Sequence, residues 1–352
     1  MNDPHEFGVL PDGRSVTAYR LGHPGALQLT VLDLGAIIHR LELPGPGGEP
    51  INVALGLPSV PDYLDSDAYF GAVVGRYANR IADSRFTLDG TSYQLAANEG
   101  RTCLHGGLDG FHTRRWEVLA SPRADVGERL ALRLVSPDGD QGFPGRLEVI
   151  ATYQVAGPVL TLDLQAVTDA PTVVNLTNHV YLNLAGEGRG SVDEHRLVVD
   201  ADEYLPVDEH GIPLGSLAPV AGTPFDLREP RPVGAAARGD HEQVGLVGGI
   251  DHSFQLRGPA AGGGLRRAAA LSDPASGRGL ELWTDQAALQ VYTGNALSGD
   301  VVGTSGRRYR QGDGIALETQ VHPDAMNHPR LTSPVLRPGQ RYAARTQWRF
   351  TW

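Results

Sequence analysis

The stretch V-N-L-T-N-H-V-Y-L-N-L-A, residues 174–185, alternates polar and apolar side chains. One set of alternate positions is polar: Asn175, Thr177, His179, Tyr181 and Asn183. The other set is apolar apart from Asn178: Leu176, Val180, Leu182 and Leu184. Because the side chains of a strand alternate between its two faces, this pattern predicts one strand whose leucine face enters a core. The polar face can hydrogen-bond a polyhydroxylated ligand, and His179 at its centre can move a proton near neutral pH.

The same two-residue period recurs from residue 85 to the C-terminus. Asp89-Gly90, set between two short apolar alternations, predicts a hairpin over residues 85–95. Further strands are predicted over residues 130–134, 147–155, 160–166, 196–199, 250–256, 280–284, 289–293, 315–321 and 342–350. Helices are expected only at 60–67 and 233–238, and a loop tip at 258–264. The fold class is therefore all-β, a large antiparallel β-sandwich, and the absence of a composition boundary favours a single domain over residues 1–352.

Composition narrows the functional classes. The formal net charge of -11 disfavours nucleic acid and anionic membranes as partners, since both need a concentrated basic surface. All 30 basic residues are Arg, so Schiff-base chemistry and a P-loop lysine are excluded. Cys103, the one cysteine, has no internal disulfide partner, and the N-terminus lacks the pattern of a signal peptide. A cytoplasmic location is the expectation.

Three predicted strands carry further polar groups on the face opposite their apolar residues. Glu318 lies in I-A-L-E-T-Q-V-H, Asp251 in G-I-D-H-S-F-Q-L, and Gln290 in L-Q-V-Y-T-G-N. A carboxylate on such a face can take a proton from a hydroxyl group, and neighbouring amides can orient it. An ordinary exposed strand face would produce the same pattern, and for a single glutamate this is the commoner case.

Two loop motifs add candidate ligand-binding groups. Asn79 and Arg80 in G-R-Y-A-N-R-I can donate hydrogen bonds to sugar hydroxyls, although an arginine that supports a loop carboxylate fits equally well. His105 in C-L-H-G-G precedes two glycines, which permit close approach of a ligand but also occur in plain turns. The chain has no H-E-x-x-H, no paired cysteines, no EF-hand spacing and no G-x-G-x-x-G before a helix. Neither a metal nor an organic cofactor is therefore expected.

Taken in order, these motifs resemble those of the aldose 1-epimerase (galactose mutarotase) family. The resemblance rests on the segments at 75–81, 89–90, 103–107, 136–145, 175–184, 204–208, 249–254, 289–295 and 317–329. It implies a galactose mutarotase-like supersandwich with a sugar cleft on a concave sheet face and without a cofactor. It also implies that Glu318 is the general base and His179 the general acid. The groups implied to bind or orient hydroxyls are Asn79, Arg80, His105, Asp251 and Gln290, with Tyr181 as an additional candidate.

The implied reaction is the interconversion of the α and β anomers of a free aldohexose, a monosaccharide of the glucose or galactose type. A glutamate with a pKa near ~4.3 is ionised at neutral pH, and a histidine near ~6.5 needs modest help, which Asp251 could give, to stay protonated. Two alternatives stay open: a noncatalytic carbohydrate-binding protein, and a glycoside hydrolase that uses Asp251 and Glu318. Both a monomer and a homodimer are compatible with the sequence.

Overall fold

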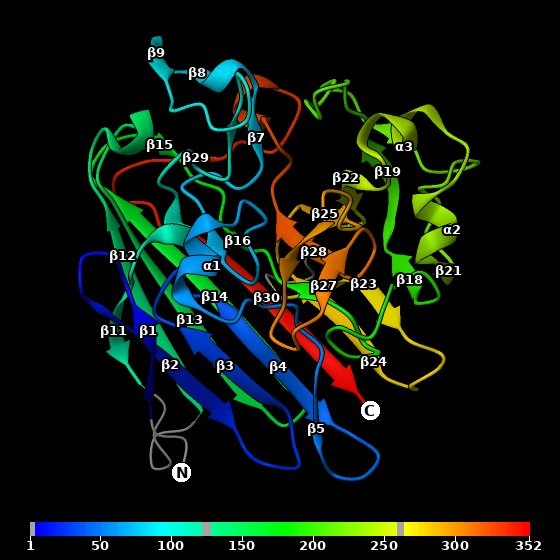
Figure 1. Ribbon diagram of the computed structural model, residues 1–352. Coiled ribbons are helices and arrows are strands. Elements are labelled where there is room, and N and C mark those ends of the chain that lie inside the picture. Colours follow the sequence, from blue (N-terminus) through cyan, green and yellow to red (C-terminus); the bar gives the residue numbers. More distant parts are fainter. Residues whose placement is uncertain (1–3, 122–127, 259–263) are drawn as a thin grey trace.

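The computed structural model describes residues 4–121, 128–258 and 264–352. Its largest element is a nine-stranded antiparallel sheet in the order β11-β12-β13-β14-β30-β24-β23-β18-β21. These strands are β11 (Glu117–Ala120), β12 (Arg129–Ser136), β13 (Leu147–Ala156), β14 (Val159–Thr168), β30 (Tyr342–Thr351), β24 (Gly279–Thr284), β23 (Arg266–Ser272), β18 (Arg196–Val199) and β21 (Arg231–Pro232). Figure 1 shows this sheet behind the rest of the molecule, with β30 in red beside β14.

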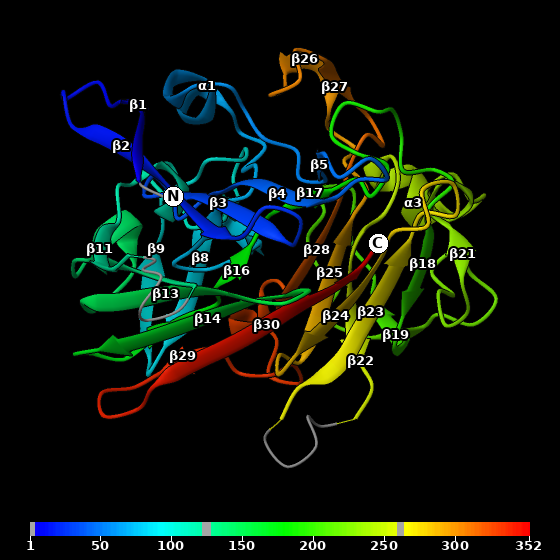
Figure 2. The same cartoon turned by 90° about the horizontal axis from the view of Figure 1, so that it is seen from below.

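Two further sheets pack on the large one. A six-stranded sheet has the order β17 (Tyr181–Leu182), β28 (Ile315–Gln320), β25 (Ala288–Tyr292), β22 (Asp251–Leu256), β19 (Ala201–Leu205) and β20 (Ala218–Pro219). The N-terminal sheet comprises β1 (His5–Val9), β2 (Ser15–Gly22), β3 (Gln28–Leu32), β4 (Ile38–Pro44) and β5 (Pro50–Asn52). Strand β2 contacts β12 and β13, and in both views the N-terminal sheet lies over β13 and β14 (Figure 1 and Figure 2).

The remaining elements are short. Five strand pairs complete the sheets: β6 (Val73–Val74) with β16 (Thr177–Asn178), β7 (Arg80–Ile81) with β10 (Cys103–Leu104), β8 (Arg85–Leu88) with β9 (Thr91–Gln94), β15 (Thr172–Val173) with β29 (Val335–Leu336), and β26 (Ser298–Val302) with β27 (Arg308–Arg310). The α-helices are α1 (Val60–Asp65), α2 (Val233–Ala237) and α3 (Glu242–Val247). Within the described ranges, no helix has the length and apolarity needed to cross a bilayer.

The main core lies between the six-stranded and nine-stranded sheets. Leu317 of β28 and Val291 of β25 are buried in the same cluster as Leu282 and Trp348 of the large sheet. Because side chains alternate along a strand, the neighbours Glu318 and Gln290 must point to the opposite face of the six-stranded sheet. Core packing therefore presents these two polar groups away from the main core.

Most predicted elements are confirmed. The strands over 130–134, 147–155 and 160–166, the hairpin at 85–95 and the later strands occur where expected, and α1 ends two residues before the predicted limit at residue 67. The helix α3 and the strands β1 to β5 were not predicted. Most of the predicted loop tip at 258–264 lies outside the described residues.

The prediction of one strand over 174–185 is wrong. The segment forms β16, which pairs with β6, and β17, which pairs with β28 in another sheet. His179 lies in the link between them, where its N–H donates to the carbonyl of Ala72 at 2.8 Å and its carbonyl accepts from the N–H of Gly71 at 3.0 Å. The chain therefore changes strand partners at the histidine, and these two main-chain bonds fix its position.

Candidate active site

A cavity of about 220 Å³ lies over the polar face of the six-stranded sheet. Its walls come from segments that are distant in sequence: Asp67, Ala68, Tyr69, Asn79, Arg80, Asn98, Glu99, Leu104, His105, His179, Tyr181, Asp251, Tyr292, Ala296, Leu297 and Glu318. Seven of the eight predicted site residues are in this set. The eighth, Gln290, lies beside the cavity and donates from Nε2 to Asp251 Oδ1 at 2.7 Å. The fold thus brings all the predicted residues together.

His179 and Glu318 are both buried and lie close together in the cavity wall. The distance between His179 Nε2 and Glu318 Oε1 is 3.6 Å, and the side chains are only 5% and 2% exposed. Glu318 is held at the centre of β28, opposite Gln290 of β25, which is itself opposite Ser253 of β22. His179 Nδ1 and Glu318 Oε2 are buried and have no protein hydrogen-bond partner, so both groups have unused hydrogen-bonding capacity.

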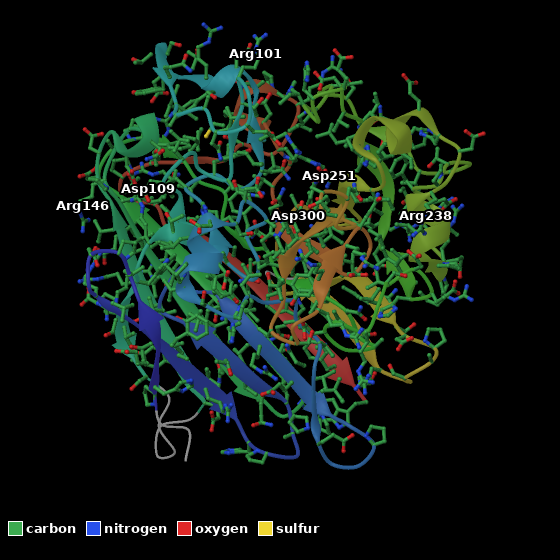
Figure 3. All side chains as sticks on the ribbon, viewed as in Figure 1. Arg101, Asp109, Arg146, Arg238, Asp251 and Asp300 are labelled. Carbon is green, nitrogen blue, oxygen red and sulfur yellow. The ribbon has the colours of Figure 1, made fainter. Side chains whose placement is uncertain are left out.

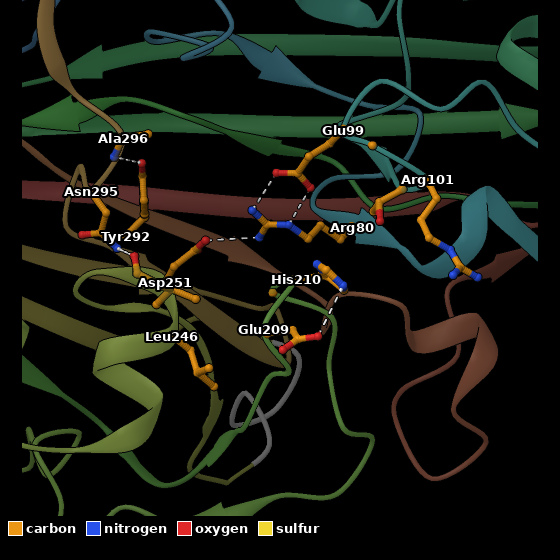
Figure 4. Close-up of a pocket in the computed structure, with 14 residues that line it drawn as sticks. Arg80, Glu99, Arg101, Glu209, His210, Leu246, Asp251, Tyr292, Asn295 and Ala296 are labelled. Atoms are coloured by element: carbon orange, nitrogen blue, oxygen red, sulfur yellow. Dashed lines mark hydrogen bonds and ion pairs between the residues drawn. The ribbon is translucent and has the colours of Figure 1, made fainter.

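Arg80 and Asp251 are tied into one hydrogen-bonded network at the edge of the cavity. Arg80 donates from Nη1 to Asp251 Oδ2 at 3.1 Å, and from Nε and Nη2 to the two carboxylate oxygens of Glu99 at 2.8 and 3.0 Å (Figure 4). Burial alone would lower the pKa of Arg80, but Asp251 and Glu99 raise it above its ordinary value. The structure therefore shows Arg80 supporting the loop carboxylate of Glu99 and lining the cavity, while donation to sugar hydroxyls stays a prediction.

Asn79 fixes the protonation of His105. The Asn79 N–H donates to His105 Nδ1 at 3.1 Å, so a neutral imidazole must carry its proton on Nε2. Burial lowers the pKa of His105 well below its ordinary value, with further lowering by His179 and Arg80. Because the ring is neutral, His105 can donate one hydrogen bond from Nε2, and its lining position allows a ligand oxygen to accept it.

Three side chains of the site are of the types that bind metal ions. His105, His179 and Glu318 bring ligand-type atoms within 4.8 Å of one another. The ligand atoms of a tetrahedral zinc ion lie about 3.3 Å apart, and each imidazole must offer a lone pair. The hydrogen bond from the Asn79 N–H occupies the lone pair on His105 Nδ1, so the ring presents an N–H donor at Nε2. The three groups therefore suit a hydroxyl oxygen better than a cation.

Burial controls the proton affinities of the central pair. It lowers the pKa of His179 to about 4, and Asp251 opposes this effect only in part. It raises the pKa of Glu318 well above its ordinary value, and Asp251 adds to the increase while Arg80 opposes it. Asp251 thus acts on His179 in the expected direction, but the expectation that modest help keeps the imidazole protonated is wrong for the empty cavity, because desolvation dominates.

Aromatic residues close the cavity on one side. The Tyr181 ring lies 4.9 Å from the His179 ring and 5.9 Å from the Tyr292 ring. Burial raises the pKa of Tyr181 well above its ordinary value, so the phenol stays neutral. The position of Tyr181 in the lining agrees with its place among the candidates, whereas contact with a substrate stays a prediction.

Several lining residues were not predicted. Tyr292 had a usable signal, because it lies two residues from Gln290 and therefore on the same face of β25. Glu99 lies in an irregular loop, where no periodicity relates its sequence position to that of Arg80. Tyr69 also lies outside any helix or strand. Sequence patterns thus located strand residues of the site but could not locate these loop residues.

A larger, open cavity of about 760 Å³ adjoins the site and shares Arg80, Glu99 and Asp251 with it. Its outer wall includes Arg101, Glu209, His210 and Leu246 (Figure 4). Asp251 lies near the middle of the molecule, whereas Arg146 and Arg238 lie at its edge (Figure 3). The side chain of Asp251 is accordingly 15% exposed, against 60% for Arg238. The charged residues Arg80, Glu99 and Asp251 therefore lie between the outer cavity and the inner cavity, which contains His179 and Glu318.

Comparison with known proteins agrees with this geometry. The model of a protein family described as aldose 1-epimerase matches residues 17–349. The galactose mutarotase of Bos taurus is 41% identical over 345 residues, which cover 98% of this chain and 97% of that protein. The galactose mutarotase of Homo sapiens is 40% identical with the same coverage. The aldose 1-epimerase of Escherichia coli strain K12 is 39% identical and covers 97% of each chain.

Solved structures show the same fold. The galactose 1-epimerase from Lactobacillus acidophilus NCFM superposes with a TM-score of 0.86 at 30% identity, covering 99% of this chain and 98% of that one. The aldose epimerase homologue from C. elegans has a TM-score of 0.86 at 28% identity, covering 95% and 98%. The all-β sandwich expected from the sequence is confirmed. The chain belongs to the aldose 1-epimerase family of isomerases.

Proposed function

We propose that this protein interconverts the α and β anomers of a free aldohexose of the glucose or galactose type, with Glu318 as general base and His179 as general acid. The observation that carries these roles is the buried pair of proton-transfer groups, 3.6 Å apart at the inner end of the cavity. General acid–base catalysis needs such groups within reach of the reacting oxygens. A cavity of about 220 Å³ is a suitable size for one pyranose ring.

The reaction needs two proton transfers in opposite directions. Glu318 removes the proton from the C1 hydroxyl while His179 gives a proton to the ring oxygen O5, and the C1–O5 bond breaks to leave an open-chain aldehyde. Rotation about C1–C2 then presents the other face of the carbonyl to the O5 hydroxyl. On reclosure His179 takes back the O5 proton and Glu318 returns a proton to O1, so both groups end in their starting states.

This cycle uses one proton shared by the pair. Burial favours the neutral form of both groups, a protonated Glu318 and an uncharged His179 imidazole. A bound sugar brings hydroxyl donors to the carboxylate and stabilises its charge, so the proton moves to His179. The reactive ion pair therefore forms when substrate is bound.

The surrounding groups hold the sugar rather than react with it. Asp251 accepts hydrogen bonds from Arg80 and Gln290, one at each carboxylate oxygen. It is therefore an orienting group, and the observation does not favour a hydrolase in which Asp251 would act as an acid or base. A noncatalytic sugar-binding protein would have no need of the buried histidine and glutamate pair, whose burial is unfavourable without a function.

Location, partner and domain organisation belong to the same proposal. A cytoplasmic location is supported by Cys103, which is a buried free thiol. The formal net charge of -11 supports a neutral monosaccharide, and not nucleic acid or an anionic membrane, as the partner. The family match over residues 17–349 supports a single domain.

Polarimetry on freshly dissolved α-D-glucose and α-D-galactose tests the proposal. His179→Asn and Glu318→Gln are each expected to lower kcat by roughly 10²- to 10⁴-fold with a small change in KM, because each removes one proton-transfer group. His39→Asn and Glu42→Gln are matched controls, since both residues are buried and lie outside the cavity lining. Near-wild-type rates in both active-site variants would exclude this mechanism, and release of reducing ends from a disaccharide would favour the hydrolase.

A further inference from the structure

Tyr69 has a backbone conformation that is rare for a bulky residue. Its φ is 54°, and among the described residues it is one of nine non-glycine residues with positive φ. Two of the others, Asn79 and His105, line the same cavity. Positive φ is unfavourable for a tyrosine and persists where the surroundings enforce it, often at functional sites. Three of these nine residues therefore line the cavity, and Tyr69 is the bulkiest of them.

A tight turn explains why Tyr69 adopts this backbone conformation. The carbonyl of Tyr69 accepts from the Ala72 N–H at 3.1 Å. The next residue, Phe70, is buried against Tyr181 and Tyr309, with ring centroids 5.1 and 5.4 Å apart. Because Phe70 is anchored on that side, the turn directs Tyr69 into the cavity, where its side chain is 8% exposed.

The Tyr69 ring packs among three histidines. Its centroid lies 4.5 Å from that of His105, 4.6 Å from that of His112 and 6.0 Å from that of His179. The His105 and His179 rings are themselves 5.2 Å apart in an edge-to-face arrangement. Such distances are those of favourable ring contacts, so Tyr69 restricts the orientation of His105 and covers one approach to His179.

The phenol oxygen ties the same ring to the loop that carries His105. Asn98 donates from Nδ2 to the Tyr69 hydroxyl at 3.3 Å and to the Leu104 carbonyl at 3.0 Å. Its Oδ1 accepts from the Leu104 N–H at 2.7 Å. Leu104 directly precedes His105, so Asn98 links the tyrosine to the backbone position of the histidine.

We infer that Tyr69 is a positioning residue of the active site, which holds His105 in place and screens His179 from water. This inference rests on the proposed role of His179 as the acid. Groups from every neighbouring element surround that imidazole: Glu318 from β28, Asp251 from β22, Tyr292 from β25, Tyr181 from β17 and His105 from the loop after β10. When Tyr69 is changed, His105 loses its ring contact and the His179 imidazole loses its cover, whereas no such contact with Tyr69 supports Glu318 or Asp251.

Three variants separate the ring from the hydroxyl. Tyr69→Phe keeps the ring but loses the hydrogen bond from Asn98, so it should lower kcat less than Tyr69→Leu does. Tyr69→Leu removes the ring and should lower kcat on the order of 10- to 100-fold, because misplaced groups reduce the rate steeply. Tyr63→Leu is the matched control, since Tyr63 is also buried and hydrogen-bonded but lies outside the cavity lining. Urea unfolding of all three corrects for a general loss of stability.

An NMR titration of His179 provides a readout independent of catalysis, with the resonance assigned by its loss in His179→Asn. In the wild type and in Tyr69→Phe the His179 signal should not titrate between pH 8 and 5.5. In Tyr69→Leu water reaches the ring, and the midpoint should rise toward about 6.5. An unchanged titration in a folded Tyr69→Leu variant would overturn the inference. Full activity of His179→Asn would instead overturn the proposed role of His179, whatever the titration shows.

Discussion

His179 illustrates how position, and not residue type, determines proton affinity. The sequence placed it on a polar face and Asp251 was expected to favour its charged form. The cavity buries the imidazole so fully that its pKa falls to about 4 in spite of Asp251. Desolvation of a charged group outweighs one carboxylate that is itself neutralised by Arg80. The sequence identifies the histidine, but the burial of its side chain depends on contacts with distant segments of the chain.

The pH dependence of kcat/KM follows from the pKa shifts of His179 and Glu318. The pKa of His179 is lowered to about 4, so the imidazole does not titrate between pH 8 and pH 6, and burial raises the pKa of Glu318 above its ordinary value. We expect kcat/KM to stay level from pH 8 to pH 6, measured by polarimetry after subtraction of the buffer-catalysed rate. A histidine acting as the acid with a pKa near ~6.5 would instead make kcat/KM rise about 25-fold from pH 8 to pH 6. Such a change would contradict the prediction.

Among the elements, β16 and β17 show what the alternation of polar and apolar residues can predict and what it cannot. The alternation over residues 174–185 correctly separated the leucine face from the polar face, since Leu176 and Leu182 enter the main core. It could not show that the chain changes partners at His179, because alternation describes faces and not strand pairing. The strands β3 and β4 were also not predicted, although residues 28–31 and 40–43 alternate polar and apolar side chains. The apolar set lies in the main core, so a usable signal was present there.

The loop after β10 depends on Gly106 for the placement of His105. Gly106 has φ of 93°, and a Cβ there would lie 2.0 Å from the Gly75 carbonyl oxygen. Gly106→Ala therefore has to displace backbone, whereas Gly100→Ala, at φ of 59° with no heavy atom within 4 Å, adds only local strain. We expect Gly100→Ala to lower the free energy of unfolding by about 1 kcal/mol and Gly106→Ala by more than 2 kcal/mol.

Urea unfolding and polarimetry on the two alanine variants measure these effects. Gly106→Ala should also lower kcat/KM, because His105 moves with the loop. Gly100→Ala should retain activity. Equal stability loss and full activity in both variants would show that the loop accommodates the added methyl group.

For the molecule as a whole, the site exists only through long-range contacts. Its predicted residues run from Asn79 to Glu318, and they meet because β7, β22, β25 and β28 are brought to one cavity. Ordered motifs were sufficient to predict the fold class and the residues that meet at this cavity. The ion pairs of Arg80 with Glu99 and Asp251, and the cavity volume, depend on loop conformations that no local pattern encodes.

The same burial makes the whole fold sensitive to acid. Five histidines have a pKa lowered to about 4, mainly by burial: His39, His112, His179, His252 and His322. In the unfolded chain each has a pKa near ~6.5, so between these values the unfolded state binds more protons. Their contribution to stability is fully present above pH 6.5 and is lost as the pH falls toward 4, at up to about 1.4 kcal/mol per pH unit for each group.

Buried carboxyl groups oppose this trend but do not cancel it. Burial raises the pKa of Asp33, Glu318 and Asp324, so their protonation favours the folded state as the pH falls. The histidines are more numerous, and we therefore expect the free energy of unfolding to decrease from pH 7 to pH 5.5 by several kcal/mol. Urea unfolding followed by tryptophan fluorescence at pH 7.5, 6.5 and 5.5 measures this decrease. His39→Gln removes one of the titrating groups and should make the decrease smaller, whereas a urea midpoint independent of pH over this range would show that the histidines do not titrate on unfolding.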